Sequence, residues 1–152
     1  MVLYMDRHSF SWNIPLPLTD PSGHVRYTIT GDAYAPGRRL QVLDLAGRTA
    51  VSIRQSFPSL FPRYELEVYG KPVCSLIKDL RFLPPQYTVS PLPWTLHGSV
   101  QAHDYALMQA EVAIASCQPD PLHPGLLTLE LFSENQTELL TALGIMVTVN
   151  CV

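Results

Sequence analysis

The chain has 152 residues, a formal net charge of −3 and an apolar fraction of 47%, which favours a globular domain over a disordered chain. It has no basic excess, so we expect no nucleic-acid partner. Only 15% of the residues are charged, against about a quarter in most proteins, which predicts that much of the chain is interior.

The first ten residues lack the long apolar run of a secretion signal. Three cysteines without C-x-x-C spacing are typical of reduced thiols rather than of a disulfide framework or a zinc site. Both observations predict a cytoplasmic protein.

Apolar and polar residues alternate with a period of two through most of the first 130 residues, for example at 25–30, 51–56 and 64–69. This pattern predicts strands with one buried and one solvated face. Turn residues follow at 20–23, 44–47 and 69–71, and each turn contains a glycine. Proline-rich segments at 57–62, 82–85 and 118–125 separate further strands. We therefore expect a series of hairpins over about 1–132.

The segment 139–152 is apolar on every face, so a helix here is either buried on all sides or membrane-spanning. Its 14 residues reach about 21 Å as a helix, short of the roughly 30 Å hydrocarbon core. This length favours a core helix over about 135–151 and argues against a scramblase-like, bilayer-inserted helix. Ser133 and Asn135 both match the capping-box pattern, which leaves two candidate N-caps. Gly144 predicts close approach of a strand backbone.

Catalytic motifs are absent from the sequence: it has no nucleophile elbow, phosphate loop or paired metal-binding histidines. His103 and Asp104 form the one adjacent histidine–carboxylate pair, but neighbours on a strand point to opposite faces. We expect no enzymatic activity, no catalytic residue, no metal and no cofactor. An enzyme using His103, Asp104 and Glu111 is the weaker alternative.

Basic residues recur along three successive predicted strands and their turns. Arg54, Arg63, Lys78 and Arg81 would form a patch if those strands are neighbours, and such a patch would bind anionic lipid. The competing interpretation is that these residues solvate the outer face beside Glu65. Strand register decides between the two.

A set of short motifs occurs in order over nearly the whole chain. The set comprises 10–12 (Phe-Ser-Trp), 20–23 (Asp-Pro-Ser-Gly), 57–65 (Phe-Pro-Ser-Leu-Phe-Pro-Arg-Tyr-Glu), 85–87 (Pro-Gln-Tyr), Trp94 with Gly98, 102–105 (Ala-His-Asp-Tyr), and the closing helix with Asn-Cys-Val at 150–152. The ordered set resembles the LURP-one-related family, which is related to the Tubby C-terminal domain and to phospholipid scramblases.

The resemblance implies a mainly β (α+β) fold, a 12-stranded antiparallel β-barrel closed around a central C-terminal helix, as one domain over 1–152. Family members of this type have no established enzymatic activity, and Tubby domains bind phosphoinositides. Two hypotheses follow. One is a non-enzymatic Tubby-like module that binds a ligand or a protein partner, without a transmembrane segment. The other is peripheral binding to anionic lipid, phosphoinositides included.

Overall fold

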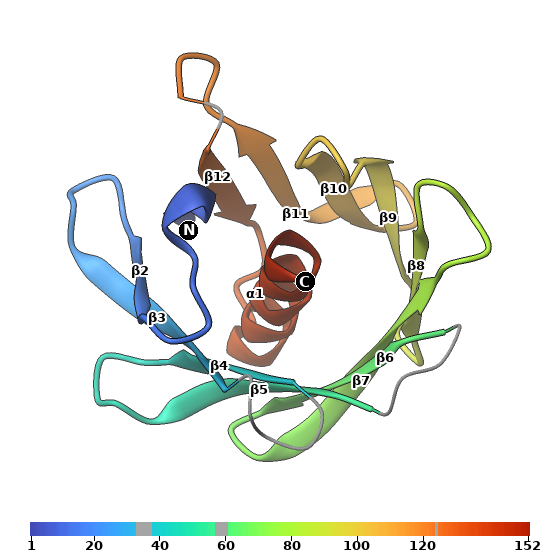
Figure 1. Cartoon of the computed structure of the whole chain (residues 1–152), viewed down its shortest axis with the longest axis horizontal. Helices are drawn as coiled ribbons and strands as arrows, with labels where there is room; N and C mark the ends of the chain where they lie inside the picture. The colour runs from blue at the N-terminus through green and yellow to red at the C-terminus, as the bar shows by residue number, and fades with distance from the viewer. Residues whose placement is uncertain (33–37, 57–60, 124) are drawn as a thin grey trace.

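The computed structural model describes residues 1–32, 38–56, 61–123 and 125–152. In this part of the chain, twelve strands form one antiparallel sheet that surrounds a single α-helix (Figure 1). The strands are β1 Val2–Asp6, β2 Leu16–Thr19, β3 Val25–Asp32, β4 Arg39–Leu43, β5 Thr49–Gln55, β6 Arg63–Val68, β7 Lys71–Asp79, β8 Gln86–Ser90, β9 Trp94–Ser99, β10 Asp104–Gln109, β11 Val112–Pro119 and β12 Leu126–Leu131. A 3₁₀ turn, η1 (Arg7–Ser9), follows β1, and α1 spans Gln136–Cys151.

Each strand pairs with its neighbour in sequence except at the step from β8 to β9, and β1 also pairs with β12, which joins the two ends of the chain. The resulting order, β8 through β1 and then β12 through β9, is an up-and-down barrel, and the predicted fold is confirmed. The closure differs from the prediction. Among the described residues no hydrogen-bonded ladder joins β8 to β9, so the barrel is nearly rather than fully closed. Prolines flank this connection, and proline has no N–H to donate to a ladder.

The predicted hairpin turns are confirmed where the structure describes them. The Asp20 carboxylate accepts hydrogen bonds from the backbone N–H groups of Ser22 and His24 at 2.9 and 3.0 Å. Asp44 repeats this geometry in the turn between β4 and β5. Residues 57–60 of the first predicted proline-rich segment lie outside the described residues.

The helix begins at the second of the two predicted caps. The side chain of Asn135 accepts a hydrogen bond from the N–H of Glu138 at 3.0 Å, and the Ser133 hydroxyl donates to the Glu138 carboxylate at 2.8 Å. Every residue from Leu140 to Asn150 is buried, as expected for a helix that is apolar all round. In the part of the chain that the structure describes, no helix is both long enough and apolar enough to span a membrane.

Gly144 lies where the helix packs against β5 and β6. A Cβ atom at this position would lie 2.7 Å from Cγ1 of Val51 and 3.1 Å from Cδ2 of Leu66. The predicted close approach is therefore present, but side chains make it rather than a strand backbone. The absence of a side chain at 144 gives these two branched residues their space in the core.

Candidate functional site

A cavity of about 520 Å³ opens at the end of the barrel where α1 ends, and we call it the mouth cavity. Its polar lining comprises Arg7, Lys78, Tyr87, Gln101 and His103. Its apolar lining comprises Val100, Val149 and residues 83–85. The cavity thus brings together η1, β7, β8, the β9–β10 turn and the helix, which are far apart in the sequence.

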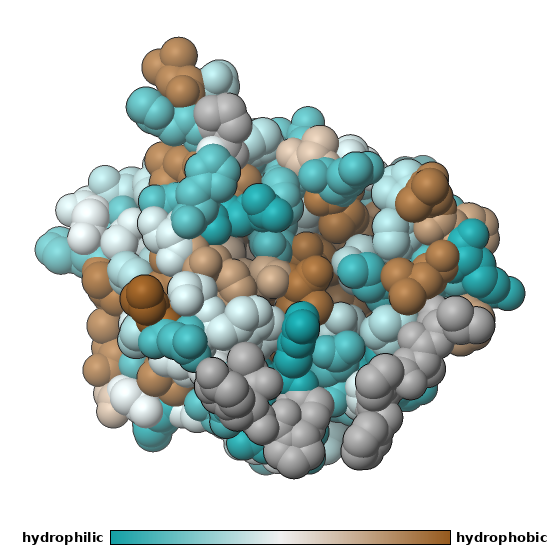
Figure 2. All heavy atoms as spheres, in the orientation of Figure 1, coloured by the Kyte–Doolittle hydropathy of each residue, from teal (hydrophilic) through white to brown (hydrophobic). Residues whose placement is uncertain are grey.

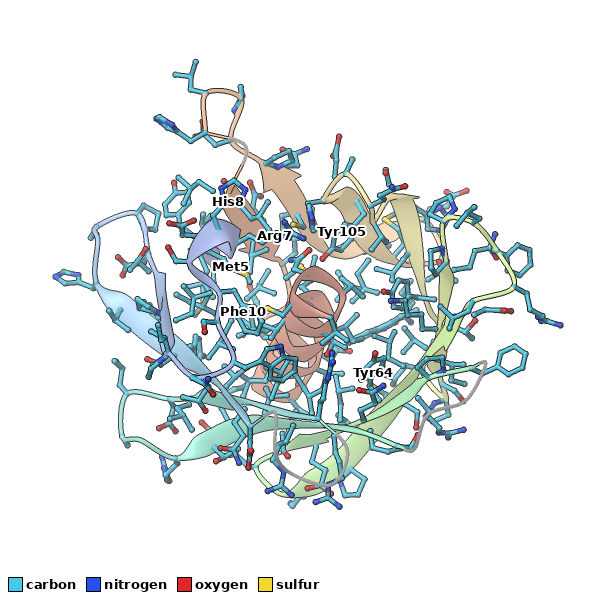
Figure 3. All side chains as sticks on the ribbon, in the orientation of Figure 1. Met5, Arg7, His8, Phe10, Tyr64 and Tyr105 are labelled. Atoms are coloured by element: carbon cyan, nitrogen blue, oxygen red, sulfur yellow. The ribbon has the colours of Figure 1, made fainter. Side chains whose placement is uncertain are left out.

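Arg7 is placed at the mouth by the 3₁₀ turn that follows β1. Asp6 caps this turn, because its carboxylate accepts hydrogen bonds from the His8 N–H and the Ser9 hydroxyl. The Arg7 N–H donates to the Gly125 carbonyl at 2.9 Å, which fixes the turn against the start of β12. The Nε of Arg7 donates to the backbone carbonyl of Asn150 at 3.3 Å, and Figure 3 shows Arg7 beside the C-terminal end of α1.

A buried polar network joins the helix end to the cavity wall. Oδ1 of Asn150 accepts hydrogen bonds from the Tyr105 hydroxyl at 3.1 Å and from Nδ1 of His103 at 3.0 Å. Because an amide oxygen only accepts, Nδ1 of His103 carries the proton in this contact. The Asn150 amide also donates to Sγ of Cys117 at 3.6 Å. Burial raises the pKa of Tyr105 well above its usual value, so its hydroxyl stays a donor.

Lys78 faces the mouth because it lies two positions after the buried Leu76 on β7, and residues two apart on a strand share a face. Its ammonium lies 5.9 Å from the ring centroid of Tyr87, its cross-strand partner, in a cation–π contact. Burial raises the pKa of Tyr87 to about 12, so the hydroxyl is neutral and able to donate at physiological pH.

The mouth cavity has an excess of positive charge. No carboxylate lies among the described residues that line it. In the described part of the chain, neither Arg7 nor Lys78 has an acidic partner within ion-pair distance, whereas Arg26, Arg48, Arg63 and Arg81 each have one. The negative end of the helix dipole points toward the same mouth, and Arg7 offsets it by donating to a terminal carbonyl.

The four basic residues predicted to bind anionic lipid are distributed over two faces. Arg54 lies on the outer face of β5, opposite Glu65 in the ladder. Arg63 is on the same face, and its Nε lies 2.6 Å from the carboxylate of Glu65. The hydroxyl of Ser75 donates to that carboxylate and, with the guanidinium of Arg63, lowers the pKa of Glu65. Arg63 therefore has its charge balanced on the barrel wall.

The other two predicted residues lie at the ends of the short segment 78–81. Lys78 lines the mouth cavity, as described above. Arg81 follows β7 and donates two hydrogen bonds to Asp79, at 3.1 and 2.8 Å. Its guanidinium also lies 4.9 Å from the ring centroid of Phe61. Sequence reasoning thus placed one predicted residue in the mouth cavity and missed Arg7, Tyr87 and Gln101, for which the sequence has no periodic signal.

The residues of the alternative catalytic hypothesis do not converge. His103 lines the mouth cavity, but Asp104 is exposed at the start of β10 and Glu111 is exposed in the turn after it. His103 is hydrogen-bonded to an amide rather than to a nucleophile. Within the described residues, no three histidine, cysteine or acidic side chains come together as metal ligands.

Comparison with known proteins identifies relatives of this fold. A family model described as LURP-one-related matches residues 1–147. The chain is similar to the uncharacterized protein YxjI of Bacillus subtilis (strain 168), at 32% identity over 109 residues, which is 72% of this chain and 67% of YxjI. The fold is also similar to the X-ray structure of a protein from Arabidopsis thaliana, with a TM-score of 0.64 and 10% identity. That match covers 98% of this chain and 90% of the plant protein.

Proposed function

The chain belongs to the LURP-one-related family, and we propose that it is a non-enzymatic binding module that takes an anionic, phosphate-bearing ligand in its mouth cavity. The observation that carries this proposal is the pair of cations at the mouth, Arg7 and Lys78, without a carboxylate among the described lining residues. Arginine and lysine with tyrosine and histidine donors are the side chains that bind phosphate oxygens. The ligand is a lipid headgroup or a free phosphate compound, which share this chemistry.

The chemistry of the mouth favours binding over turnover. Nδ1 of His103 is hydrogen-bonded to Asn150, and the hydroxyl of Tyr87 stays protonated because burial raises its pKa to about 12. Neither group therefore acts as a nucleophile at neutral pH. What remains is a set of donors around a cavity of about 520 Å³, a volume that admits a sugar-phosphate or an inositol-phosphate headgroup.

The proposal is tested by calorimetric titration with inositol 1,4,5-trisphosphate and with inorganic phosphate at low and physiological salt. Lys78→Gln should weaken binding of the trisphosphate about tenfold or more, since a charge-assisted hydrogen bond contributes about 1.5–3 kcal/mol. Arg54→Gln is the matched control, because Arg54 lies on the outer face of the barrel. Absence of binding to the unchanged protein, or equal loss in both variants, would refute the proposal.

Peripheral binding to anionic lipid through Arg54, Arg63, Lys78 and Arg81 is the second candidate. It is supported by the position of Lys78 and Arg81 at the two ends of one surface segment. In that case Arg54→Gln and Lys78→Gln should each weaken sedimentation with phosphoinositide-containing vesicles, and salt should weaken it further. Equal sedimentation with neutral and anionic vesicles would exclude this function.

A further inference from the structure

Large apolar side chains protrude beside the mouth cavity. Leu80 and Phe82 are both 44% exposed, and Leu83 is 98% exposed. All three belong to the loop that joins β7 to β8, residues 80–85, which we call the mouth loop. Figure 2 shows hydrophobic and hydrophilic side chains interleaved along the right-hand side of the molecule, where Figure 1 places this loop.

The mouth loop differs from the other turns that expose a leucine. Leu45 and Leu122 are also strongly exposed, but among the described residues each is the one large apolar residue of its turn that is exposed. Isolated apolar residues are common on protein surfaces and need no partner. In the mouth loop, by contrast, Leu80, Phe82 and Leu83 lie within four positions, so their exposure is a property of the whole loop.

The apolar loop and the cationic mouth form one surface. Leu83 lines the mouth cavity together with Lys78 and Arg7. Phe82 and Leu83 also line a neighbouring cavity of about 650 Å³, which lies along the open β8–β9 edge. Arg81, whose charge is matched by Asp79, lies between Leu80 and Phe82 in the sequence. Exposed apolar side chains next to cations without an acidic partner are complementary to an anionic lipid–water interface.

We propose that the mouth loop inserts Leu83 and Phe82 into the interface of an anionic bilayer, while Lys78 and Arg7 contact lipid phosphates at the mouth. This inference rests on the proposed function and names a bilayer as the source of its ligand. The 98% exposure of Leu83 favours a bilayer over a protein surface, since an acyl phase accepts a protruding side chain without a matching pocket. Burial of apolar area and attraction to anionic lipid both contribute to such binding.

The test uses the full chain with vesicles of neutral lipid and of neutral lipid mixed with phosphatidylinositol 4,5-bisphosphate. Leu83→Ser should lower the vesicle partition coefficient about tenfold at both low and physiological salt, because burial of a leucine is not screened by ions. Lys78→Gln should lower it mainly at low salt. Leu45→Ser is the matched control, since that leucine is 73% exposed in a turn outside the mouth.

A second measurement reports insertion directly. Leu83→Trp should show emission that is quenched by lipids brominated in their acyl chains, whereas Leu45→Trp should not. Equal partitioning of Leu83→Ser and Leu45→Ser, or absence of quenching in Leu83→Trp, would overturn insertion. Soluble inositol trisphosphate separates the two proposals. Binding of that probe with no vesicle binding keeps the mouth site and overturns insertion. Vesicle binding that depends on Leu83, with no binding of the soluble probe, supports insertion of the loop alone and overturns the phosphate contacts of Lys78 and Arg7.

Discussion

The packing of the central helix against β5 and β6 is best tested by giving Gly144 a side chain. In a helix interior, replacing glycine with alanine normally stabilises a protein by about 1 kcal/mol. Here the new methyl group would lie 2.7 Å from Cγ1 of Val51 and 3.1 Å from Cδ2 of Leu66. The leucine methyl is at the end of a flexible side chain and moves easily. The valine methyl does not, because a β-branched side chain has few allowed rotamers.

The contact with Val51 therefore decides the sign of the effect. Overpacking of a core costs about 1–3 kcal/mol, and the helical gain of about 1 kcal/mol leaves a net loss of about 1 kcal/mol. Urea unfolding monitored by circular dichroism should show a lower free energy of unfolding for Gly144→Ala. The melting temperature should fall by about 3 °C for a chain of this size.

A double-mutant cycle identifies the contact responsible. Combining Gly144→Ala with Val51→Ala should recover about 1–2 kcal/mol relative to the sum of the single effects, because the methyl group then has space. Val89→Ala is the matched control, since Val89 is buried on β8 and contributes none of the atoms nearest to a Cβ at position 144. Stabilisation of the single variant by about 1 kcal/mol, or equal coupling to both valines, would refute this account of the core.

Three further predictions follow from the core and the barrel wall. Leu143→Asp should abolish folding, because it places an unpaired charge in the fully buried helix; a folded, soluble variant with a normal near-ultraviolet spectrum would contradict this. Cys74 and Cys117, whose pKa values burial raises to about 12 and about 11, should resist Ellman's reagent at pH 8 until the protein unfolds, and immediate labelling would contradict their burial. Glu65 has a lowered pKa, chiefly because the Ser75 hydroxyl donates to it, so the folded state favours its charged form. The stability that it contributes should be present above pH 4.5 and lost as the pH falls through its folded pKa, and Glu65→Gln should flatten this acid limb in urea titrations.

The architecture was predictable because two physical patterns divide the chain. Alternation with a period of two defines one buried and one solvated face for strands such as β5 and β6. The all-apolar segment after Asn135 has no solvated face, so it has to be enclosed. The number of strands came from the family resemblance. The open β8–β9 edge was not predictable, because it depends on hydrogen bonds that fail to form rather than on a residue pattern.

The mouth cavity was less accessible to sequence reasoning. Arg7 and Lys78 meet there because β1 pairs with β12 and the helix runs back through the barrel, and local patterns report neither of these long-range contacts. The prediction of one basic patch required the basic residues of separate strands to lie on the same face of the sheet. Lys78 lies two positions from the buried Leu76 and shares its inward face, whereas Arg54 is next to the buried Ile53 and faces outward. Whether a residue occupies an odd or an even position along its strand decides which face of the sheet its side chain occupies. Only the pairing of the strands shows which cations are neighbours.

The two cations of the mouth contribute differently to the stability of the free protein and to its affinity for an anion. Arg7 donates to the Asn150 carbonyl, so it stabilises the negative end of the helix even in the absence of a ligand. Lys78 makes its cation–π contact with Tyr87, which belongs to β8 rather than to the helix. Loss of Arg7 should therefore lower both the stability of the free protein and its affinity for an anion, whereas loss of Lys78 should chiefly lower affinity, because its contact in the free protein is one cation–π pair. A saturating anion stabilises the folded state by about 2.7 kcal/mol at one hundred times its dissociation constant. An anion at the mouth is repelled by the negative end of the helix dipole and attracted by the two cations. The stabilisation on binding therefore depends on Arg7, which offsets the dipole.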